Sequence, residues 1–298
     1  MSKTLALSFL IFNGLFWGFS FSLAKITAEN SIHPFGVTFW ESLIASLILL
    51  MFIIYLKKIK TLKNNFKLLK LYIFLSLTGI VLPGVLFFYS AAYVPAGILA
   101  ILITLAPIIT YAIALPIGME IYSFKRILGV LIGFISVSVL VFPEQTLPNP
   151  EMIPWIFVGC FCASCYAFQG IIISLKFNDQ NNPIIMAFWM NIICMIILLP
   201  SLFFEKTRVI LGFNEKIADI SILTLGLIEA ICFSLQMYLI TRSGAVFASQ
   251  VGYIVTISGV IWGIIIFKEI HSFLVFVSLI LVLIGLLLVN PRKFKETD

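Results

Sequence analysis

Long apolar segments alternate with short polar breaks along the whole chain. Ten of these segments can cross the ~30 Å hydrocarbon core of a bilayer as helices, because a helix rises about 1.5 Å per residue. The breaks contain turn formers such as His33-Pro34, Val94-Pro95 and Ser243-Gly244. The pattern therefore predicts an all-α integral membrane protein. The ten predicted spans cover residues 5–26, 35–56, 70–92, 96–118, 124–142, 154–174, 183–204, 219–241, 245–267 and 271–289.

The composition excludes a soluble fold. Hydrophobic residues make up 61% of the 298 residues and charged residues only 11%, too few to coat a water-exposed globule. The formal charge of +6 does not indicate a nucleic-acid partner, because the basic residues lie mainly in the short breaks between apolar segments. The expected partners are the lipid bilayer and a small-molecule substrate, and we expect a monomer or a homodimer.

The distribution of basic residues predicts the topology. If the N-terminus is cytoplasmic, fourteen of the nineteen Lys and Arg residues lie on the inner side and five on the outer side. Cytoplasmic loops carry the excess of positive charge in membrane proteins. We therefore expect a multi-pass protein of the cell (inner) membrane with both termini in the cytoplasm.

The chain contains an internal repeat. An ungapped shift of 149 residues superposes residues whose match is improbable by chance in apolar helices. It predicts two halves, residues 1–146 and 147–298, joined by a Pro-containing linker over residues 144–154. The matched sets are Pro34, Phe39 and Trp40 with Pro183, Phe188 and Trp189; Tyr89 with Tyr238; and Glu120-Ile121-Tyr122-Ser123-Phe124 with Glu269-Ile270-His271-Ser272-Phe273.

Each half contains five predicted spans, an odd number, so the second half enters the membrane from the opposite face. The halves are therefore inverted repeats. Inverted repeats are a typical construction of secondary transporters, in which the substrate site lies near the midplane and the halves rock to alternate access.

Several motifs resemble those of a known superfamily. These are Phe16-Trp17-Gly18-Phe19-Ser20 in the first span, Pro107 followed by Glu120, and Glu269 followed by Ser278 and Gly285. Their order within a duplicated five-span unit resembles the drug/metabolite transporter superfamily, with the EamA-like ten-span permeases as the most similar type. The resemblance implies a cavity lined by spans 1, 3, 4, 6, 8 and 9, and export of small metabolites. Members often carry an Arg early in span 2, where this chain has Glu41.

Two acidic residues within the spans are candidates for proton coupling. Glu229 lies about ten residues into its span, near ~15 Å depth, where an ionisable group costs on the order of 3 kcal/mol. The alternative is a protonated acid bonded to a neighbouring helix. Glu41 lies nearer the outer end of span 2, and its alternative is a helix-end acid that extends outward to the interface or pairs with Lys25. For Glu120 and Glu269, which follow spans 4 and 9, we expect capping or loop contacts.

Polar and aromatic side chains form stripes on five predicted helices, at spacings that place them on one face. The stripes combine amides with aromatic rings, and Trp17 and Tyr166 are equivalent under the 149-residue shift. Aromatic faces beside a carboxylate suit a partly apolar or cationic amine. The alternative for each aromatic residue is helix packing. The predicted substrate-binding residues are Asn13, Trp17, Ser20, Thr104, Tyr111, Tyr166, Gln169, Gln236, Gln250 and Tyr253.

Motifs for other functions are missing from the sequence. It contains no G-x-x-x-x-G-K-[ST], H-E-x-x-H or G-x-S-x-G, and all five cysteines lie inside apolar segments. We therefore expect no cofactor, no metal and no enzymatic activity. The predicted function is secondary transport, and the resemblance implies export of amino acids or related metabolites. The alternatives are carriage of phosphorylated or nucleotide-linked metabolites, and a membrane scaffold without transport.

Overall fold

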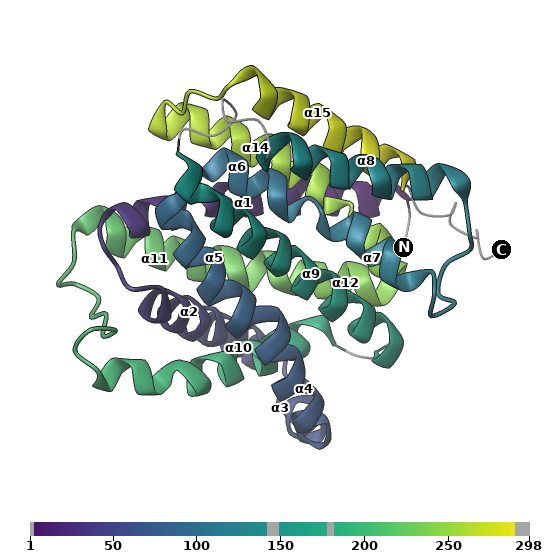
Figure 1. Cartoon of the computed structure of the whole chain (residues 1–298). Helices are drawn as coiled ribbons and strands as arrows, with labels where there is room; N and C mark the ends of the chain where they lie inside the picture. The colour runs from purple at the N-terminus through teal and green to yellow at the C-terminus, as the bar shows by residue number, and fades with distance from the viewer. Residues whose placement is uncertain (1–2, 142–148, 178–181, 290–298) are drawn as a thin grey trace.

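The computed structural model describes residues 3–141, 149–177 and 182–289, and every regular element in these ranges is helical (Figure 1). The prediction of an all-α fold is confirmed. The first half contains α1 (Lys3–Glu29), α2 (Pro34–Tyr55), α3 (Ile59–Asn64), a 3-10 turn (Asn65–Leu68), α4 (Leu69–Ser76), a π-helical turn (Leu77–Val81), α5 (Leu82–Tyr93), α6 (Ala96–Ile103), α7 (Ala106–Ala114) and α8 (Phe124–Val141).

The second half follows a similar order, with an additional 3-10 turn at its start and no counterpart of α3 in its described residues. It contains a 3-10 turn (Pro150–Met152), α9 (Ile153–Lys176), α10 (Pro183–Leu198), a 3-10 turn (Leu199–Phe203), α11 (Lys216–Ile228), a π-helical turn (Glu229–Phe233), α12 (Ser234–Ser243), α13 (Ala245–Ala248), α14 (Val251–Phe267) and α15 (Phe273–Leu288). The boundary at 146/147 and the linker residues 144–148 lie outside the described residues. The rest of the predicted linker forms the 3-10 turn Pro150–Met152 and the start of α9 at Ile153.

Ten apolar helical stretches cross the bundle. In the described ranges, nine are long and apolar enough to span a membrane, and Phe273–Leu288 is a shorter tenth. We number them in chain order: span 1 is α1, span 2 is α2, span 3 is α4 to α5, span 4 is α6 to α7, and span 5 is α8. Spans 6 to 10 are α9, α10, α11 to α12, α13 to α14, and α15.

Equivalent residues cap the second span of each half. The His33 Nδ1 atom accepts a hydrogen bond from the Phe35 backbone N–H at 3.2 Å, and Pro34 occupies the first turn of α2. In the second half, Asn182 Oδ1 accepts from the Ile184 N–H at 3.0 Å at the start of α10. Both caps satisfy backbone donors that have no partner within the helix.

Three spans are interrupted near their middle. Pro107 has no backbone N–H to bond the preceding turn, so α6 ends at Ile103 and α7 begins at Ala106. Spans 3 and 8 each contain a π-helical turn, at Leu77–Val81 and Glu229–Phe233. Such turns are rare in helices and occur frequently at functional sites.

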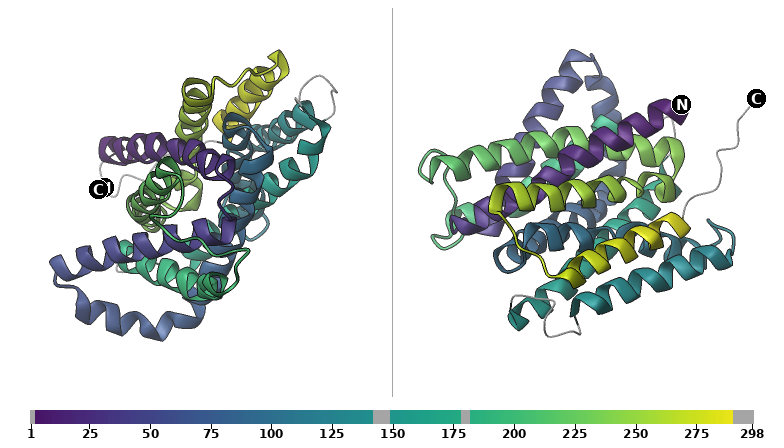
Figure 2. Two further views of the ribbon diagram at one scale, coloured as in Figure 1. Left: turned by 90° about the vertical axis from the view of Figure 1, so that its left-hand side faces the viewer. Right: turned by 90° about the horizontal axis from the view of Figure 1, so that it is seen from above.

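The two halves interleave. Span 1 packs against α14 of span 9, and correspondingly span 6 packs against α6 and α7 of span 4. Spans 2 and 7 pack against each other, as do spans 5 and 10, which lie side by side at one edge of the bundle (Figures 1 and 2). Ser136 of α8 and Ser278 of α15 join their hydroxyl oxygens at 2.9 Å. This exchange of equivalent contacts is the arrangement expected of a duplicated unit.

The outer surface of the bundle is apolar. Large side chains such as Met51, Phe134 and Ile265 are more than half exposed and point away from the core. Lipid is the solvent that such a surface requires. We call the face on which α1 begins and α15 ends the terminal face, on the right in Figure 1, and the other the opposite face.

Candidate functional site

A cavity of about 170 Å³ lies between the two halves. Its walls come from spans 1, 2, 3, 4, 6, 8 and 9, so it sits at the centre of the bundle. Both π-helical turns contribute to its wall. The turn in span 3 supplies Gly79 and Ile80, and the turn in span 8 supplies Glu229 and Phe233. The break in each span therefore places backbone and side chains at the cavity wall.

Seven of the twelve residues predicted from the sequence line this cavity. They come from spans 1, 2, 6 and 8, and the helical periodicity that suggested them correctly identified a shared face. Their roles in binding or coupling remain predictions. They are Trp17, Ser20, Glu41, Tyr166, Gln169, Glu229 and Gln236.

The other five predicted residues lie outside the cavity lining. Asn13 is fully buried behind Gln236, whose Oε1 atom accepts from the Asn13 amide at 3.3 Å. The Thr104 hydroxyl donates to the Ala100 carbonyl one turn earlier. Tyr111, Gln250 and Tyr253 are not among the lining residues either.

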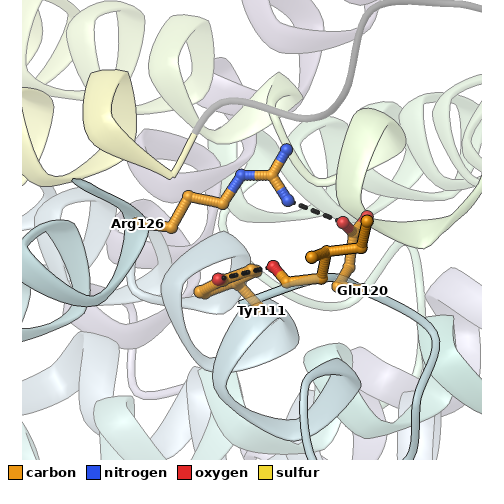
Figure 3. A network of polar contacts seen from close by, with 4 residues as sticks. Tyr111, Glu120 and Arg126 are labelled. Carbon is orange, nitrogen blue, oxygen red and sulfur yellow. Dashed lines mark hydrogen bonds and ion pairs between the residues drawn. The ribbon is translucent and has the colours of Figure 1, made fainter. Parts of the chain in front are cut away.

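Tyr111 belongs to a polar network near the terminal face (Figure 3). Its hydroxyl donates to the Ile121 carbonyl at 3.1 Å, and the Arg126 guanidinium lies 5.3 Å from its ring centroid. Arg126 Nη1 donates to Glu120 Oε2 at 2.6 Å, with both side chains nearly buried. The network fixes the connection between spans 4 and 5, which is a loop contact of the kind predicted for Glu120.

The carboxyl groups of Glu41 and Glu229 both line the cavity and lie close enough for their charges to interact. Asn191 of span 7 is within hydrogen-bonding reach of Glu229. The alternative in which Glu41 pairs with Lys25 is not observed: in the described part of the chain, no ion pair joins these two residues. Spans 2 and 8 thus bring two acidic groups to one wall.

Four hydrogen-bond donors of the cavity lining are engaged with backbone carbonyls. Gln169 Nε2 donates to the Leu75 carbonyl at 3.5 Å, and Gln236 Nε2 donates to the Ala248 carbonyl at 3.3 Å. The hydroxyls of Ser20 and Thr110 donate to carbonyls of their own helices. Because these donors are engaged while two carboxylates face the space, the cavity favours a ligand that donates hydrogen bonds and carries positive charge.

Three phenylalanines that sequence reasoning missed line the cavity: Phe21, Phe87 and Phe88. Phe233, which the helical period predicts on the inward face with Glu229 and Gln236, lines it as well. The repeat contained a signal for one of them, because Phe87 is the counterpart of Gln236 under the 149-residue shift. Together with Trp17 and Tyr166 they give the site a largely aromatic wall, suited to flat or partly apolar groups and to cations.

The cavity extends toward the terminal face. Ile240, Ala245 and Ser249, at the terminal ends of spans 8 and 9, line it. Their counterparts under the 149-residue shift are Ala91, Ala96 and Ala100 near the opposite face, each 0% exposed and outside the lining. The structure is therefore closed toward the opposite face and hollow toward the terminal face.

A ten-span bundle of two related halves with a central cavity defines a multi-pass membrane transporter. The chain matches the EamA-like transporter family over residues 4–142 and again over residues 153–290, and it belongs to this family. The family assignment confirms the resemblance to the drug/metabolite transporter superfamily.

Two further similarities agree with this assignment. An uncharacterized transporter of Archaeoglobus fulgidus is 26% identical over 163 residues, which span 55% of this chain and 56% of that relative. A protein of known crystal structure superposes with a TM-score of 0.70 at 13% identity, covering 96% of each chain. At this identity the second match shows the fold alone.

Proposed function

We propose that this protein is a secondary transporter that exports amino acids or related amine-bearing metabolites by alternating access between its two halves. The observation that carries the proposal is the pair of carboxylates, Glu41 and Glu229, in a central aromatic cavity. Among the described residues that line the cavity, none is Lys or Arg. An ammonium group compensates the negative charge, and aromatic faces add a favourable cation–π contact.

The same charge pattern argues against the competing transport function. Phosphorylated or nucleotide-linked metabolites carry fixed negative charge and need Arg or Lys partners. Glu41 stands at the position in span 2 where related proteins often have Arg, so the cavity repels such anions. A scaffold without transport does not explain why seven spans leave a cavity with two acidic side chains at the centre of an otherwise close-packed bundle.

The proposed direction of transport rests on the predicted topology and on the side toward which the cavity extends. On the predicted topology the terminal face is cytoplasmic, so the cavity is reached from the cytoplasm, where an exporter loads its substrate. Proton exchange at Glu229, with Glu41 nearby, supplies a driving force, because a carboxyl group can bind a proton on one side and release it on the other.

Counterflow into liposomes that hold only the purified protein tests the proposal. The panel contains an amine without a carboxylate, the corresponding zwitterionic amino acid, and a phosphorylated metabolite of similar size. We expect saturable counterflow of the amine and of the amino acid. Comparison of these two compounds reports whether the cavity, with Glu41 and Glu229, accepts a substrate that also carries a carboxylate. Empty liposomes are the control. Saturable flux of the phosphorylated compound alone, or no saturable flux of any compound, would overturn the proposal.

A further inference from the structure

The closed side of the bundle contains a contact between the two halves. At the opposite face, Glu269 follows span 9 and reaches across to the start of α6 in span 4. Its Oε1 atom accepts from the Ala96 N–H at 2.7 Å, and its Oε2 atom accepts from the Gly97 N–H at 3.1 Å. His271 Nε2 lies 3.1 Å from Glu269 Oε2. One carboxylate thus joins the two spans that face each other across the cavity.

This contact is closely fitted. A Cβ atom at Gly97 would meet His271 Nε2 and Glu269 Oε2, and one at Gly263 would meet the same carboxylate. Lys268 adopts a left-handed backbone conformation, with φ of 52°, and turns the chain back so that Glu269 faces α6. Burial alone raises the pKa of Glu269, but the bonds from His271 and the two N–H groups outweigh it and hold the pKa below its usual value.

Between the Glu269 contact and the cavity, small residues keep spans 4 and 9 close together. A Cβ atom at Gly259 of α14 would lie against the Ala100 side chain of α6, and the Thr256 hydroxyl reaches the Ala100 carbonyl at 3.4 Å. Spans 4 and 9 are therefore in close contact near the opposite face. At the terminal end the matching positions are Thr110 and Ser249, and both line the cavity.

The equivalent carboxylate at the terminal face makes a different contact. The counterpart of Glu269 is Glu120, and the counterparts of Ala96 and Gly97 are Ala245 and Val246. Glu120 pairs with Arg126 of its own half instead. The turns differ as well, because Gly118 is the left-handed residue there, with φ of 76°, one position before the counterpart of Lys268.

We propose that Glu269 is a latch that holds the opposite face shut, and that Glu120 is the matching latch of the terminal face, held open by Arg126 in this conformation. When access alternates, Glu269 leaves α6 and Glu120 exchanges Arg126 for the backbone N–H groups at the terminal end of span 9. The inference rests on alternating access in the proposed function and assigns the two carboxylates that alternate.

Distances between spin labels test the latch without any substrate. Labels at Ala92 and Ile270, both exposed, span the opposite closure, and their counterparts Thr241 and Ile121 span the terminal opening. The labels are introduced after replacement of the five native cysteines. In Glu269→Gln the side chain keeps its shape but loses its charge. Glu120→Gln is the matched control at the symmetry-related position.

We expect Glu269→Gln to raise the ratio of long to short Ala92–Ile270 distances about tenfold or more, the change expected when charged hydrogen bonds are lost. The Thr241–Ile121 distance should shorten in the same sample, and Glu120→Gln should leave the Ala92–Ile270 distances short. An unchanged distribution in Glu269→Gln, or an equal lengthening in both variants, would overturn the latch.

A folding defect does not block the test. If Glu269→Gln gives no folded protein, Glu269→Asp keeps the charge but draws the carboxylate back by about one C–C bond, and the same two outcomes apply. Because the distances are measured without flux, a failed latch is distinguished from a failed transport function: the counterflow assay can succeed while the distances stay fixed.

Discussion

Glu229→Gln is the substitution that separates charge from shape in the cavity. Gln keeps the size and one acceptor oxygen of Glu but carries no charge. At ~4 Å, an ammonium and a carboxylate attract by about 4 kcal/mol with an effective dielectric constant of ~20. Much of this is offset by lost hydration, so the measured loss should approach that of a charged hydrogen bond, about 1.5–3 kcal/mol. Because Glu41 remains in the same cavity, we expect the lower end of that range.

This loss corresponds to a Kd for an amine ligand that is about tenfold higher in Glu229→Gln, and about a hundredfold higher when Glu41→Gln is added. Calorimetric titration of the purified protein measures it. An uncharged analogue in which a methyl group replaces the ammonium should bind both proteins equally. The control is Glu151→Gln, which neutralises an exposed acid outside the cavity.

The same variant tests proton coupling. Gln does not titrate, so proteoliposome flux in Glu229→Gln should lose its dependence on pH while the protein stays folded. Equal weakening of the charged and uncharged ligands would show that Glu229 only shapes the cavity. A pH profile identical to that of the parent protein would remove Glu229 from the coupling mechanism.

Three further predictions concern binding, stability and topology. Trp17→Ala and Tyr166→Ala should each weaken substrate binding by about 1 kcal/mol or more with little loss of folded yield, and normal binding in both would place the site elsewhere. Burial lowers the pKa of His33, and its Nδ1 atom accepts the hydrogen bond that caps α2. Neutral His33 therefore stabilises the fold above its ordinary pKa of about 6.5, and this stabilisation is lost progressively as the pH falls from that value through the lowered pKa. Thermal unfolding between pH 7 and 5 should show this loss, and His33→Asn, which caps without titrating, should reduce it. Single cysteines in the loop Lys57–Lys70 and at 144–154 should react with impermeant reagents from opposite sides of the membrane, and labelling from one side would contradict the inverted topology.

The helices and the repeat could be predicted because both are visible in the linear order of residues. Apolar length sets the spans, and the shift of 149 residues survives in residues such as Pro34 and Trp40 whose packing roles recur in both halves. The period of a helix also identifies which side chains share a face. It does not say what that face meets, and Thr104 and Tyr111 share the stripe of span 4 yet contact a backbone carbonyl and a loop.

The shape of the cavity depends on interruptions that the pattern did not reveal. The π-helical turns in spans 3 and 8 shift the register of every side chain that follows, so Phe87 and Phe88 reach the cavity from a helix with no predicted site residue. Glu41 and Glu229 were predicted individually from their cost in a bilayer. Their proximity depends on the packing of span 2 against span 8, which no local pattern encodes.

The contact between α8 and α15 indicates how the two five-span halves came to form one chain. Ser136 and Ser278 bond each other, and Gly129 lies against the Gly285 carbonyl. The shift of 149 residues converts Gly129 into Ser278 and Ser136 into Gly285, so each helix supplies one serine and one glycine, in opposite order. In two separate copies of a single five-span ancestor, inserted in opposite orientations, the fifth helix of one copy would pack against the fifth helix of the other in the same way. The fused chain fixes the ratio and orientation of its two halves by covalent linkage, and its halves are therefore free to diverge, as the acidic pair of the cavity and the unequal closures of the two faces show.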